Sequence, residues 1–507
     1  MNMLQIPRRV WLTPGERLIE FEAHVQATGL QLSDLDRLNV VHVAGTKGKG
    51  SCCAFVESIL RSQGFRTGFY SSPHILSVRE RFRVNGVPIS EDYFVDLFWR
   101  LHKCLCRFLT IMAFHFFLES KIDVAIIEVG VGGTYDSTNV VRNPVVCGIT
   151  RLDYDHTNIL GTTIEEIAWN KAGVLKRRSV AITVPQEKAA FEVISQRAKE
   201  VECALYVCQS WEDYVIPNDA EQLVLGIAGK HQLENASLAL QLARMWAFRT
   251  GNGTSIEAAS ISLPLKGMRR KKMFFALNHV RKFILLIFRC FWPGRSQKVT
   301  SNGINFYLDG AHTPLSVQVW NSCCVEWFLS ASSEMRKNPV RILVFHCTKG
   351  RQAKQLLPPL IVCWIDIVPL TVCVNRCGFQ YALFSPPATA SSDDPACGNL
   401  TSVCFGRYYH AVIPADVASL VSKREETEVA VNSHETAWLD LISDCPSCKT
   451  KSFTCVNDVY NFVKEIAKTV DANNERSVEV LVTGSLYLVG GFLSFLDPDL
   501  CGTIGPS

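Results

Sequence analysis

The sequence predicts an α/β protein of two domains, in which mainly parallel strands alternate with helices. Three observations lead to this prediction. The chain has 507 residues, enough for more than one core. Its first half alternates short β-branched runs with helical patterns, and a second strand–helix unit starts near residue 301. We therefore expect an N-terminal domain over 1–262, a linker over 263–300 and a smaller C-terminal domain over 301–507.

Four strands of a parallel sheet are expected in the first domain. They are the apolar runs 40–44, 122–129, 145–150 and 180–184. A helix after the first of them is expected to bury an apolar face formed by Phe55, Val56, Ile59 and Leu60. Another helix begins at a capping box, which is either Thr162 with Glu165 or Thr163 with Glu166. A helical run over 231–246 is expected to complete the domain.

The second domain is expected to follow a basic, glycine- and proline-containing linker at 264–272. Its first strand, 304–308, leads into Asp309-Gly-Ala-His312, and another strand, 478–482, leads into Thr483-Gly-Ser. Ligands of parallel sheets collect outside the carboxyl ends of the strands. The polar residues at these strand ends are therefore candidate site residues.

The bulk composition excludes several classes of protein. A net charge of +4 with 48% hydrophobic residues is typical of a soluble globular protein and favours neither nucleic acid nor stable membrane insertion. The apolar run 283–291 is too short to span a bilayer, and the run 356–374 contains prolines and Asp366. The first 23 residues lack the apolar core of a signal peptide. We expect a cytoplasmic protein, and an additional mitochondrial pool stays open.

The 20 cysteines are not spaced like a disulfide framework, because most lie inside apolar runs. We expect reduced, buried thiols. Cys445-Pro-Ser-Cys448, with Cys455 nearby and His434 upstream, allows a zinc site or a plain polar loop. A single CxxC without a spaced second pair favours the polar loop.

Residues 41–51 read VHVAGTKGKGS and are the most informative stretch of the chain. A strand, a glycine loop and a helix start make an anion site, because backbone N–H groups and the helix dipole attract negative charge. We expect Lys49 to face nucleotide β/γ-phosphates and Ser51 a phosphate or its metal. The candidate nucleotide-binding residues are Gly45, Thr46, Lys47, Gly48, Lys49, Gly50 and Ser51.

The loop departs from the GxxxxGK[ST] pattern, since Val43 replaces the first glycine and Gly50 separates Lys49 from Ser51. A flexible glycine turn with solvated lysines therefore remains the alternative. Glu128, which opens the second glycine loop EVGVGG, is a candidate ligand for Mg²⁺, an ion that prefers hard oxygens. The alternative is a strand-end carboxylate paired with a lysine.

These motifs occur in one order along nearly the whole chain. The stretches are DLDRLNVVHVAGTKGKGS (34–51), TGFYSSPHILSVRERFRVNGVPIS (67–90), FLTIMAFHFF (108–117), DVAIIEVGVGGTYDSTNVV (123–141), DHTNILGTTIEEIAWNKAGVLK (155–176), HQLENASLAL (231–240), WPGRSQ (292–297), YLDGAHTP (307–314) and VLVTGSLYLVGGFL (480–493). In this combination and order the chain resembles the folylpolyglutamate synthases of the Mur ligase superfamily.

The resemblance implies a P-loop-type ATPase domain with a mainly parallel sheet and a smaller Rossmann-like C-terminal domain. It implies a monomeric, ATP- and Mg²⁺-dependent ligase that adds L-glutamate to the γ-carboxyl of tetrahydrofolate or its polyglutamates. A monovalent cation is a further candidate cofactor. The metal-binding residues of the family match Ser72, Glu128 and His156, and the lysine that the family carbamylates matches Lys171. Its nucleotide and domain-closure residues match Asn235, Arg295, Asp309 and His312.

The implied mechanism follows from the chemistry of carboxylates. A carboxylate is a poor electrophile, so ATP must first convert it to an acyl phosphate, which the amine of glutamate then attacks. The phosphoryl transfer needs Mg²⁺ and cations around the transferred group, which Lys49 and Arg295 would supply. Closure of the domains would bring Arg295 and His312 to the site and exclude water.

Four segments depart from the family pattern. They are the short bridge 103–107 near the folate region, the apolar inserts 274–291 and 361–376, and the turn 349–352, which lacks the usual acidic residue. Two alternatives stay open beside the folylpolyglutamate ligase. One is a dihydrofolate synthase, alone or bifunctional, and the other is a folate- or nucleotide-binding protein that has lost ligation.

Overall fold

The computed structural model describes residues 13–102, 108–211, 225–229, 231–252, 290–311, 328, 339–347, 353–361, 378–387, 430–443, 448–471 and 476–498. The chain forms two compact units. Unit 1 comprises Met1–His74, Arg79–Gly226 and Gln232–Cys290, and unit 2 comprises Ile75–Val78, Ile227–His231 and Phe291–Ser507. The linker predicted over 263–300 lies mostly outside the described residues, so its bounds stay a prediction.

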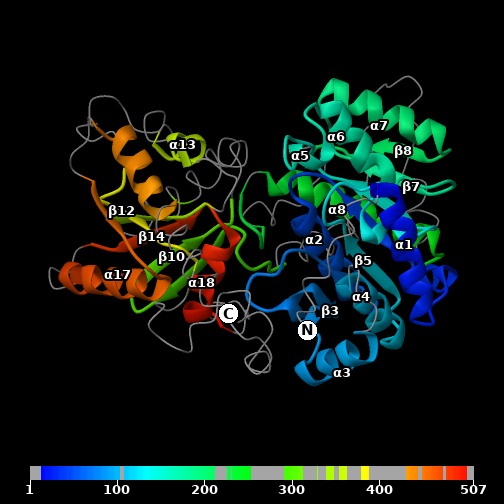
Figure 1. The fold of residues 1–507 in the computed structure, drawn as a ribbon, viewed down its shortest axis with the longest axis horizontal. Helices are drawn as coiled ribbons and strands as arrows, with labels where there is room; N and C mark the ends of the chain where they lie inside the picture. Colours follow the sequence, from blue (N-terminus) through cyan, green and yellow to red (C-terminus); the bar gives the residue numbers. More distant parts are fainter. Residues whose placement is uncertain are drawn as a thin grey trace, which may run out of the picture. The chain divides into compact units, whose positions relative to one another are not determined.

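The described part of unit 1 contains an eight-stranded sheet in the order β4-β3-β2-β5-β1-β6-β7-β8 (Figure 1). Its strands are β1 (Val41–Ala44), β2 (Thr67–Tyr70), β3 (Phe82–Val84), β4 (Val87–Pro88), β5 (Val124–Glu128), β6 (Val146–Ile149), β7 (Val180–Thr183) and β8 (Ala204–Val207). Among the described strands of this sheet, only β2-β3 and β3-β4 pair antiparallel. Strands β1 and β5 are parallel neighbours with Val43 opposite Glu128, so the loops that follow them leave the sheet side by side.

Helices cover both faces of this sheet. They are α1 (Pro14–Ala27), α2 (Lys49–Ser62), α3 (Glu91–Leu101), α4 (Phe108–Glu119), α5 (Thr157–Leu160), α6 (Ile164–Lys171), α7 (Lys188–Glu200) and α8 (Gln232–Arg249), with 3₁₀ turns η1 (Leu32–Leu38), η2 (Val78–Arg81), η3 (Ser137–Val140) and η4 (Ala172–Val174). Helices α2 and α8 pack together on one face, where a Cβ at Gly148 of β6 would meet Leu242 of α8 at 2.7 Å. Helices α6 and α7 lie side by side on the other face (Figure 1) and share a core with Cys147 and Ile149.

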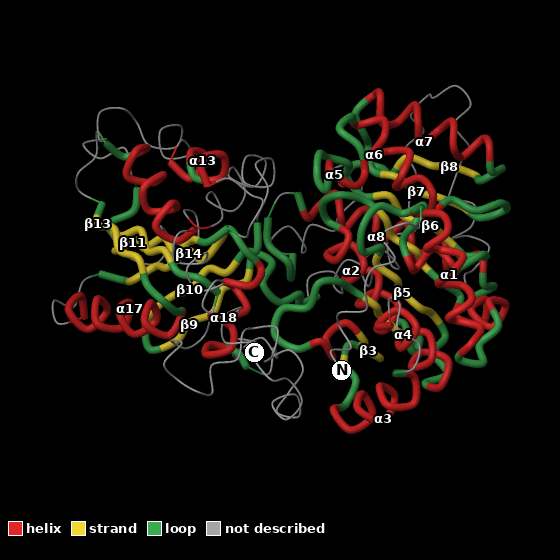
Figure 2. Tube along the Cα trace, in the orientation of Figure 1, coloured by secondary structure: helices red, strands yellow, loops and turns green. Residues whose placement is uncertain are grey.

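The described part of unit 2 contains a six-stranded sheet in the order β13-β12-β11-β14-β10-β9 (Figure 2). Its elements are β9 (Gln297–Ser301), β10 (Ile304–Leu308), β11 (Val340–Phe345), α13 (Ala353–Leu356), β12 (Tyr381–Phe384), β13 (Lys449–Ser452), α17 (Val456–Asp471), β14 (Val478–Thr483) and α18 (Leu486–Leu496). Of the strands described here, β9 alone runs antiparallel to its neighbour. Helices α17 and α18 pack on one face, and α13 and a helix over 430–441 on the other.

The predicted elements agree well with this architecture. The strands expected at 40–44, 122–129, 145–150 and 180–184 are β1, β5, β6 and β7, and those expected at 304–308 and 478–482 are β10 and β14. The mixed α/β fold with a mainly parallel sheet is confirmed. Thr163 and Glu166 form the capping box of α6. The inserts 274–291 and 361–376 and the segments 103–107 and 349–352 lie wholly or mostly outside the described residues.

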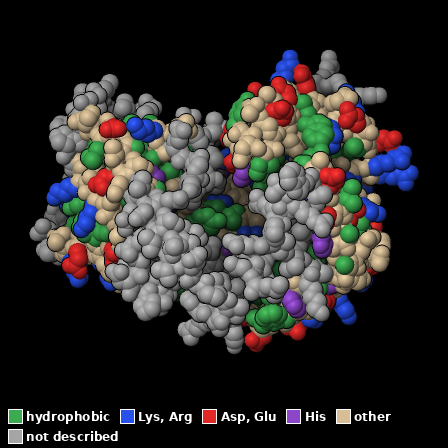
Figure 3. All heavy atoms as spheres, in the orientation of Figure 1, with side chains coloured by type: hydrophobic (Ala, Val, Ile, Leu, Met, Phe, Trp, Pro, Cys, Tyr) green, Lys and Arg blue, Asp and Glu red, His purple; other side chains and the backbone are tan. Residues whose placement is uncertain are grey.

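The described surface is mixed in charge. On the face drawn in Figure 3, acidic and basic side chains are interspersed over the described residues. In the part of the chain that the structure describes, no helix is both long and apolar enough to cross a bilayer.

Candidate active site

The glycine loop between β1 and α2, residues 45–48, is called the phosphate loop below, and its glycines give it a conformation suited to an anion. Gly48 is the N-cap of α2 with φ 84°, a left-handed conformation that favours glycine. Side chains also crowd this loop, because a Cβ at Gly48 would lie 2.1 Å from Asn235 Oδ1 and one at Gly45 would lie 1.9 Å from Thr150 Oγ1. The loop is therefore packed between the carboxyl end of β6 and the start of α8.

Polar groups of two candidate nucleotide-binding residues, Thr46 and Lys47, bond to the loop after β6. The N–H groups of Thr46 and Lys47 both donate to the carbonyl of Arg151 at 3.1 Å. The Thr46 hydroxyl donates to the Asp153 carbonyl at 3.0 Å and accepts the Asp153 N–H at 3.1 Å. The first intrahelical donor of α2 is Cys52, whose N–H bonds to the Gly48 carbonyl. The N–H groups that start α2, at residues 49–51, are thus the ones suited to phosphate.

Lysine side chains converge on the same loop. Lys49 Nζ lies 3.5 Å from the Thr46 carbonyl, and Lys47 Nζ lies 3.3 Å from Asp155 Oδ2 in a partly buried ion pair. Burial lowers the pKa of Lys47, and Asp155 opposes that shift. His156, the residue after Asp155, has φ 52° and donates its N–H to Asp155 Oδ1 at 2.9 Å. Asp155 therefore links the phosphate loop to a predicted metal residue.

Lys171 lies beneath the phosphate loop at the end of α6. Its side chain is buried and donates from Nζ to the Gly45 carbonyl at 2.8 Å. Burial and the positive charges of Lys49 and Lys47 lower the pKa of Lys171 well below its ordinary value. This environment favours the neutral form of the amine, which is the form that can act as a nucleophile.

Glu128 ends β5 beside the phosphate loop, as its register with Val43 requires. The carboxylate is 5% exposed, and its Oε2 accepts the N–H of Ser72 at 3.0 Å. The structure thus brings together the predicted metal residues Ser72 and Glu128. It places His156 on the loop after β6, with its side chain 43% exposed. Within the described ranges, no three His, Cys, Asp or Glu side chains form a metal cluster by themselves.

The second glycine loop is organised by a residue that the sequence analysis missed. Asp136 Oδ2 accepts the Val131 N–H at 3.1 Å, and its Oδ1 accepts the Thr138 hydroxyl at 2.6 Å. The Thr138 hydroxyl also contacts Nε2 of buried His42 at 2.8 Å. Asp136 is the N-cap of η3 and its Oδ1 also accepts the Thr138 N–H at 2.9 Å. Aspartate is a preferred N-cap residue, and this is the signal that could have identified it.

In unit 2 the predicted Asp309 follows β10 and is fully buried. Its Oδ2 accepts the N–H and hydroxyl of Ser296 at 2.8 and 3.2 Å, and its Oδ1 accepts the Ala311 N–H at 2.9 Å. Burial raises the pKa of Asp309, and nearby Arg295 opposes the shift. Asp309 therefore braces the turn that carries Arg295. His312 lies outside the described residues.

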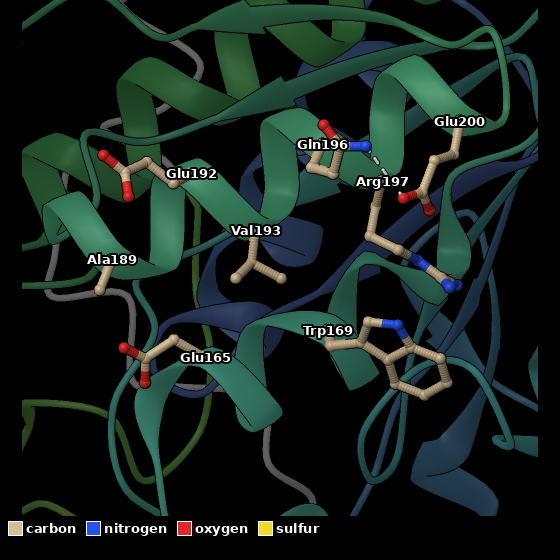
Figure 4. Close-up of a pocket in the computed structure, with 8 residues that line it drawn as sticks. All are labelled: Glu165, Trp169, Ala189, Glu192, Val193, Gln196, Arg197 and Glu200. Carbon is tan, nitrogen blue, oxygen red and sulfur yellow. Dashed lines mark hydrogen bonds between the residues drawn. The ribbon is translucent and has the colours of Figure 1, made fainter.

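A surface groove between α6 and α7 has a volume of about 370 Å³ (Figure 4). Its lining residues are Glu165, Trp169, Ala189, Glu192, Val193, Gln196, Arg197 and Glu200. The Arg197 guanidinium lies 4.4 Å from the centre of the Trp169 ring. The three carboxylates make the groove unsuited to phosphate, and no predicted site residue lines it.

Comparison with known proteins decides which family this chain belongs to. The human mitochondrial folylpolyglutamate synthase is 37% identical over 548 residues, which cover 96% of this chain and 88% of that protein. The bovine mitochondrial enzyme is 35% identical over 558 residues, covering 98% and 90%. The chain belongs to the folylpolyglutamate synthase family. An Arabidopsis thaliana folylpolyglutamate synthase is 35% identical over 533 residues, covering 92% and 81%.

Solved folylpolyglutamate synthases share the fold. The Mycobacterium tuberculosis enzyme complexed with ADP and AMPPCP aligns with a TM-score of 0.66 at 19% identity, covering 95% of this chain and 96% of that chain. Escherichia coli FolC in complex with DHPP and ADP aligns with a TM-score of 0.58 at 21% identity, covering 95% and 93%. No protein-family model matches the chain.

Proposed function

We propose that the chain is an ATP-dependent ligase that adds L-glutamate to the γ-carboxyl of tetrahydrofolate and its polyglutamates. ATP-dependent folate polyglutamylation is the activity of the family to which it belongs. The observation that carries the proposal is the convergence of Lys47, Lys49 and Lys171 on one glycine loop beside Glu128. Three lysines and a carboxylate at a helix start suit a nucleotide phosphate with its cation.

The residues beside the loop fit a Mg²⁺ ion. Ser72 and Glu128 offer hard oxygen donors at adjacent strand ends, and His156 offers an imidazole on the next loop. Mg²⁺ is usually held by one or two carboxylates together with phosphate oxygens and water, so this small protein donor set is adequate. When bound, the ion would neutralise charge on the transferred phosphoryl group. A monovalent cation is a further candidate.

Lys171 is suited to carbamylation. In its neutral form the amine can attack CO₂, forming an N–C bond and releasing one proton, and the product is an anion. Burial and two neighbouring lysines favour the neutral amine, and the negative carbamate would relieve the local excess of positive charge. The carbamate oxygens would then orient the metal or its water.

Glutamate- and folate-dependent release of ADP from the purified protein tests the proposal. We expect ADP release only when ATP, Mg²⁺, tetrahydrofolate and glutamate are all present. Lys49→Ala should reduce turnover by orders of magnitude, and Lys47→Ala should have a milder effect because Lys47 pairs with Asp155. Equal turnover in wild type and Lys49→Ala would refute the nucleotide assignment.

A dihydrofolate synthase is the second candidate, and Escherichia coli FolC in complex with DHPP and ADP supports testing it. Dihydropteroate and tetrahydrofolate assayed side by side distinguish the two activities. We further propose a monomeric protein with a cytoplasmic pool and a mitochondrial pool. The mitochondrial pool is supported by relatives named mitochondrial. Light scattering and cell fractionation test these points.

A further inference from the structure

An ion pair joins the two segments that flank the phosphate loop. Arg151, in the loop after β6, donates from Nε to Glu234 Oε1 at 3.1 Å and from Nη2 to Glu234 Oε2 at 2.6 Å. Glu234 lies in the first turn of α8. The pairing raises the pKa of Arg151. A two-point contact of this kind fixes the relative orientation of its segments better than a single contact does.

Both partners are directly connected to the phosphate loop. The Arg151 carbonyl accepts the N–H groups of Thr46 and Lys47, so it holds the first half of the loop. The residue after Glu234 is Asn235, whose amide oxygen would lie 2.1 Å from a Cβ at Gly48, so it packs against the second half. The spacing across the loop therefore depends on how the loop after β6 and the start of α8 are held together.

We propose that Arg151 and Glu234 form a clamp that sets the geometry of the nucleotide-binding loop. Both act as positioning residues, through the Arg151 carbonyl and through Asn235. The proposal rests on the assignment of this loop to ATP. The loop after β6 has a second anchor, because Gln186 accepts the Leu152 N–H at 3.0 Å and donates to the Thr150 carbonyl at 3.0 Å. Loss of the clamp should therefore shift the nucleotide-binding loop without unfolding it.

Loss of the clamp is expected to weaken nucleotide binding more than it slows the chemical step. The lysines and Glu128 stay in place, but the N–H groups that receive phosphate would be spaced less accurately. The side chains of Arg151 and Glu234 are 48% and 27% exposed, so their interaction is partly screened by water. We expect about a fivefold effect on affinity, the upper end for such a pair.

The test measures KM for ATP, kcat and the Kd for ADP in Arg151→Ala, Glu234→Ala and the double variant. Each single variant should raise KM and Kd about fivefold with kcat within about twofold, and the double variant should match the single ones. Arg151→Lys keeps the charge and loses the two-point contact, so it should be intermediate. Arg151→Lys also tests the clamp if an alanine variant fails to fold.

A matched pair in the same unit is the control. Arg177 Nε lies 2.9 Å from Glu202 Oε2, and the two side chains are 68% and 65% exposed. These residues precede strands β7 and β8, so they lie at the amino ends of the parallel strands, whereas the phosphate loop lies at the carboxyl ends. Alanine at either position should leave KM and Kd unchanged.

Three outcomes would overturn the clamp. Unchanged KM and Kd in both single variants would exclude any role for the pair. Weaker binding in Arg151→Ala but not in Glu234→Ala would mean that the guanidinium contacts the nucleotide itself. Additive effects in the double variant would mean that the two residues act separately. Failure of wild type to bind ADP would instead refute the proposed function, and the clamp with it.

Discussion

Glu128 and Asp309 are two buried carboxylates at the carboxyl ends of parallel strands, and the structure uses them differently. Asp309 accepts three hydrogen bonds from residues within its own turn or the adjacent one, and both of its oxygens are used. Glu128 accepts an N–H from Ser72, at the end of a different strand, and lies next to the phosphate loop. A position at a strand end is therefore not sufficient to give a carboxylate a chemical role.

The surroundings of each carboxylate explain the difference. Asp309 braces a turn in which Ser296 has φ 43°, so its hydrogen bonds maintain a backbone conformation that is otherwise unfavourable. Glu128 ends β5 beside β1, and Lys171 and Lys49 contact the loop that follows β1. We therefore expect Glu128 to matter chiefly for turnover and Asp309 chiefly for stability.

The largest effect is expected from Glu128→Gln. This change keeps the size of the side chain and removes the charge that would hold Mg²⁺, so kcat should fall by about three orders of magnitude or the Mg²⁺ requirement should rise steeply. Steady-state rates over a range of Mg²⁺ concentrations measure it. Glu57→Gln is the matched control, because Glu57 is also 5% exposed but bonds to Arg61 and Thr67. Normal Mg²⁺ dependence in Glu128→Gln would contradict its role.

Lys171→Ala should be nearly inactive, and short carboxylic acids should partly restore the rate by replacing the carbamate oxygens. Intact-mass spectrometry should detect the added CO₂ in wild type under conditions that preserve the carbamate. Lys176→Ala is the control, because Lys176 is another largely buried lysine whose burial lowers its pKa but which donates to the Asn139 carbonyl. An active enzyme with unmodified Lys171 would exclude the carbamate.

Asp309→Asn should lower the free energy of unfolding of unit 2 by about 2–3 kcal/mol, since an amide cannot accept all three donors and its NH₂ group would face one of them. Denaturant titration measures this loss. Turnover should fall less than in Glu128→Gln. Ser296→Ala removes one of the three donors and should cost less. A fully stable but inactive Asp309→Asn would show that Asp309 acts on a ligand.

The smallest effect concerns acid. Burial lowers the pKa of His42 from its ordinary 6.5 to about 3, so its contribution to stability is complete above pH 6.5 and is lost as the pH falls towards 3. Asp309 has a raised pKa and responds with the opposite sign. His42→Gln should reduce the loss of unfolding free energy between pH 6 and 5 by at most about 1.4 kcal/mol. An unchanged pH slope would mean that His42 is not buried as a neutral ring.

Much of the fold could be predicted because its central strands are continuous apolar runs. Six predicted strands are observed, including β1 and β5, whose pairing brings Val43 to Glu128. Several missed strands are short or polar, but β11, VRILVF, is a six-residue apolar strand that the prediction also omits. Strand β9, QKVTS, lies at an edge with one neighbour, and β2, TGFY, contains a glycine. Neither carries the period-2 or apolar signal on which the prediction depends.

The sequence by itself determined the family, six of the strands and the motifs that carry Lys49, Glu128 and Lys171. Only the tertiary structure decided what those motifs touch. The Arg151 carbonyl accepts hydrogen bonds from the N–H groups of Thr46 and Lys47. The Gly45 carbonyl accepts one from Lys171 Nζ, 126 residues away in the sequence. Every residue has such a carbonyl, so no pattern of side chains marks the ones that are used. Burial likewise lowers the pKa of Lys171 and raises the pKa of Asp309, and no sequence pattern gives these shifts, because a pKa depends on neighbours brought together by folding.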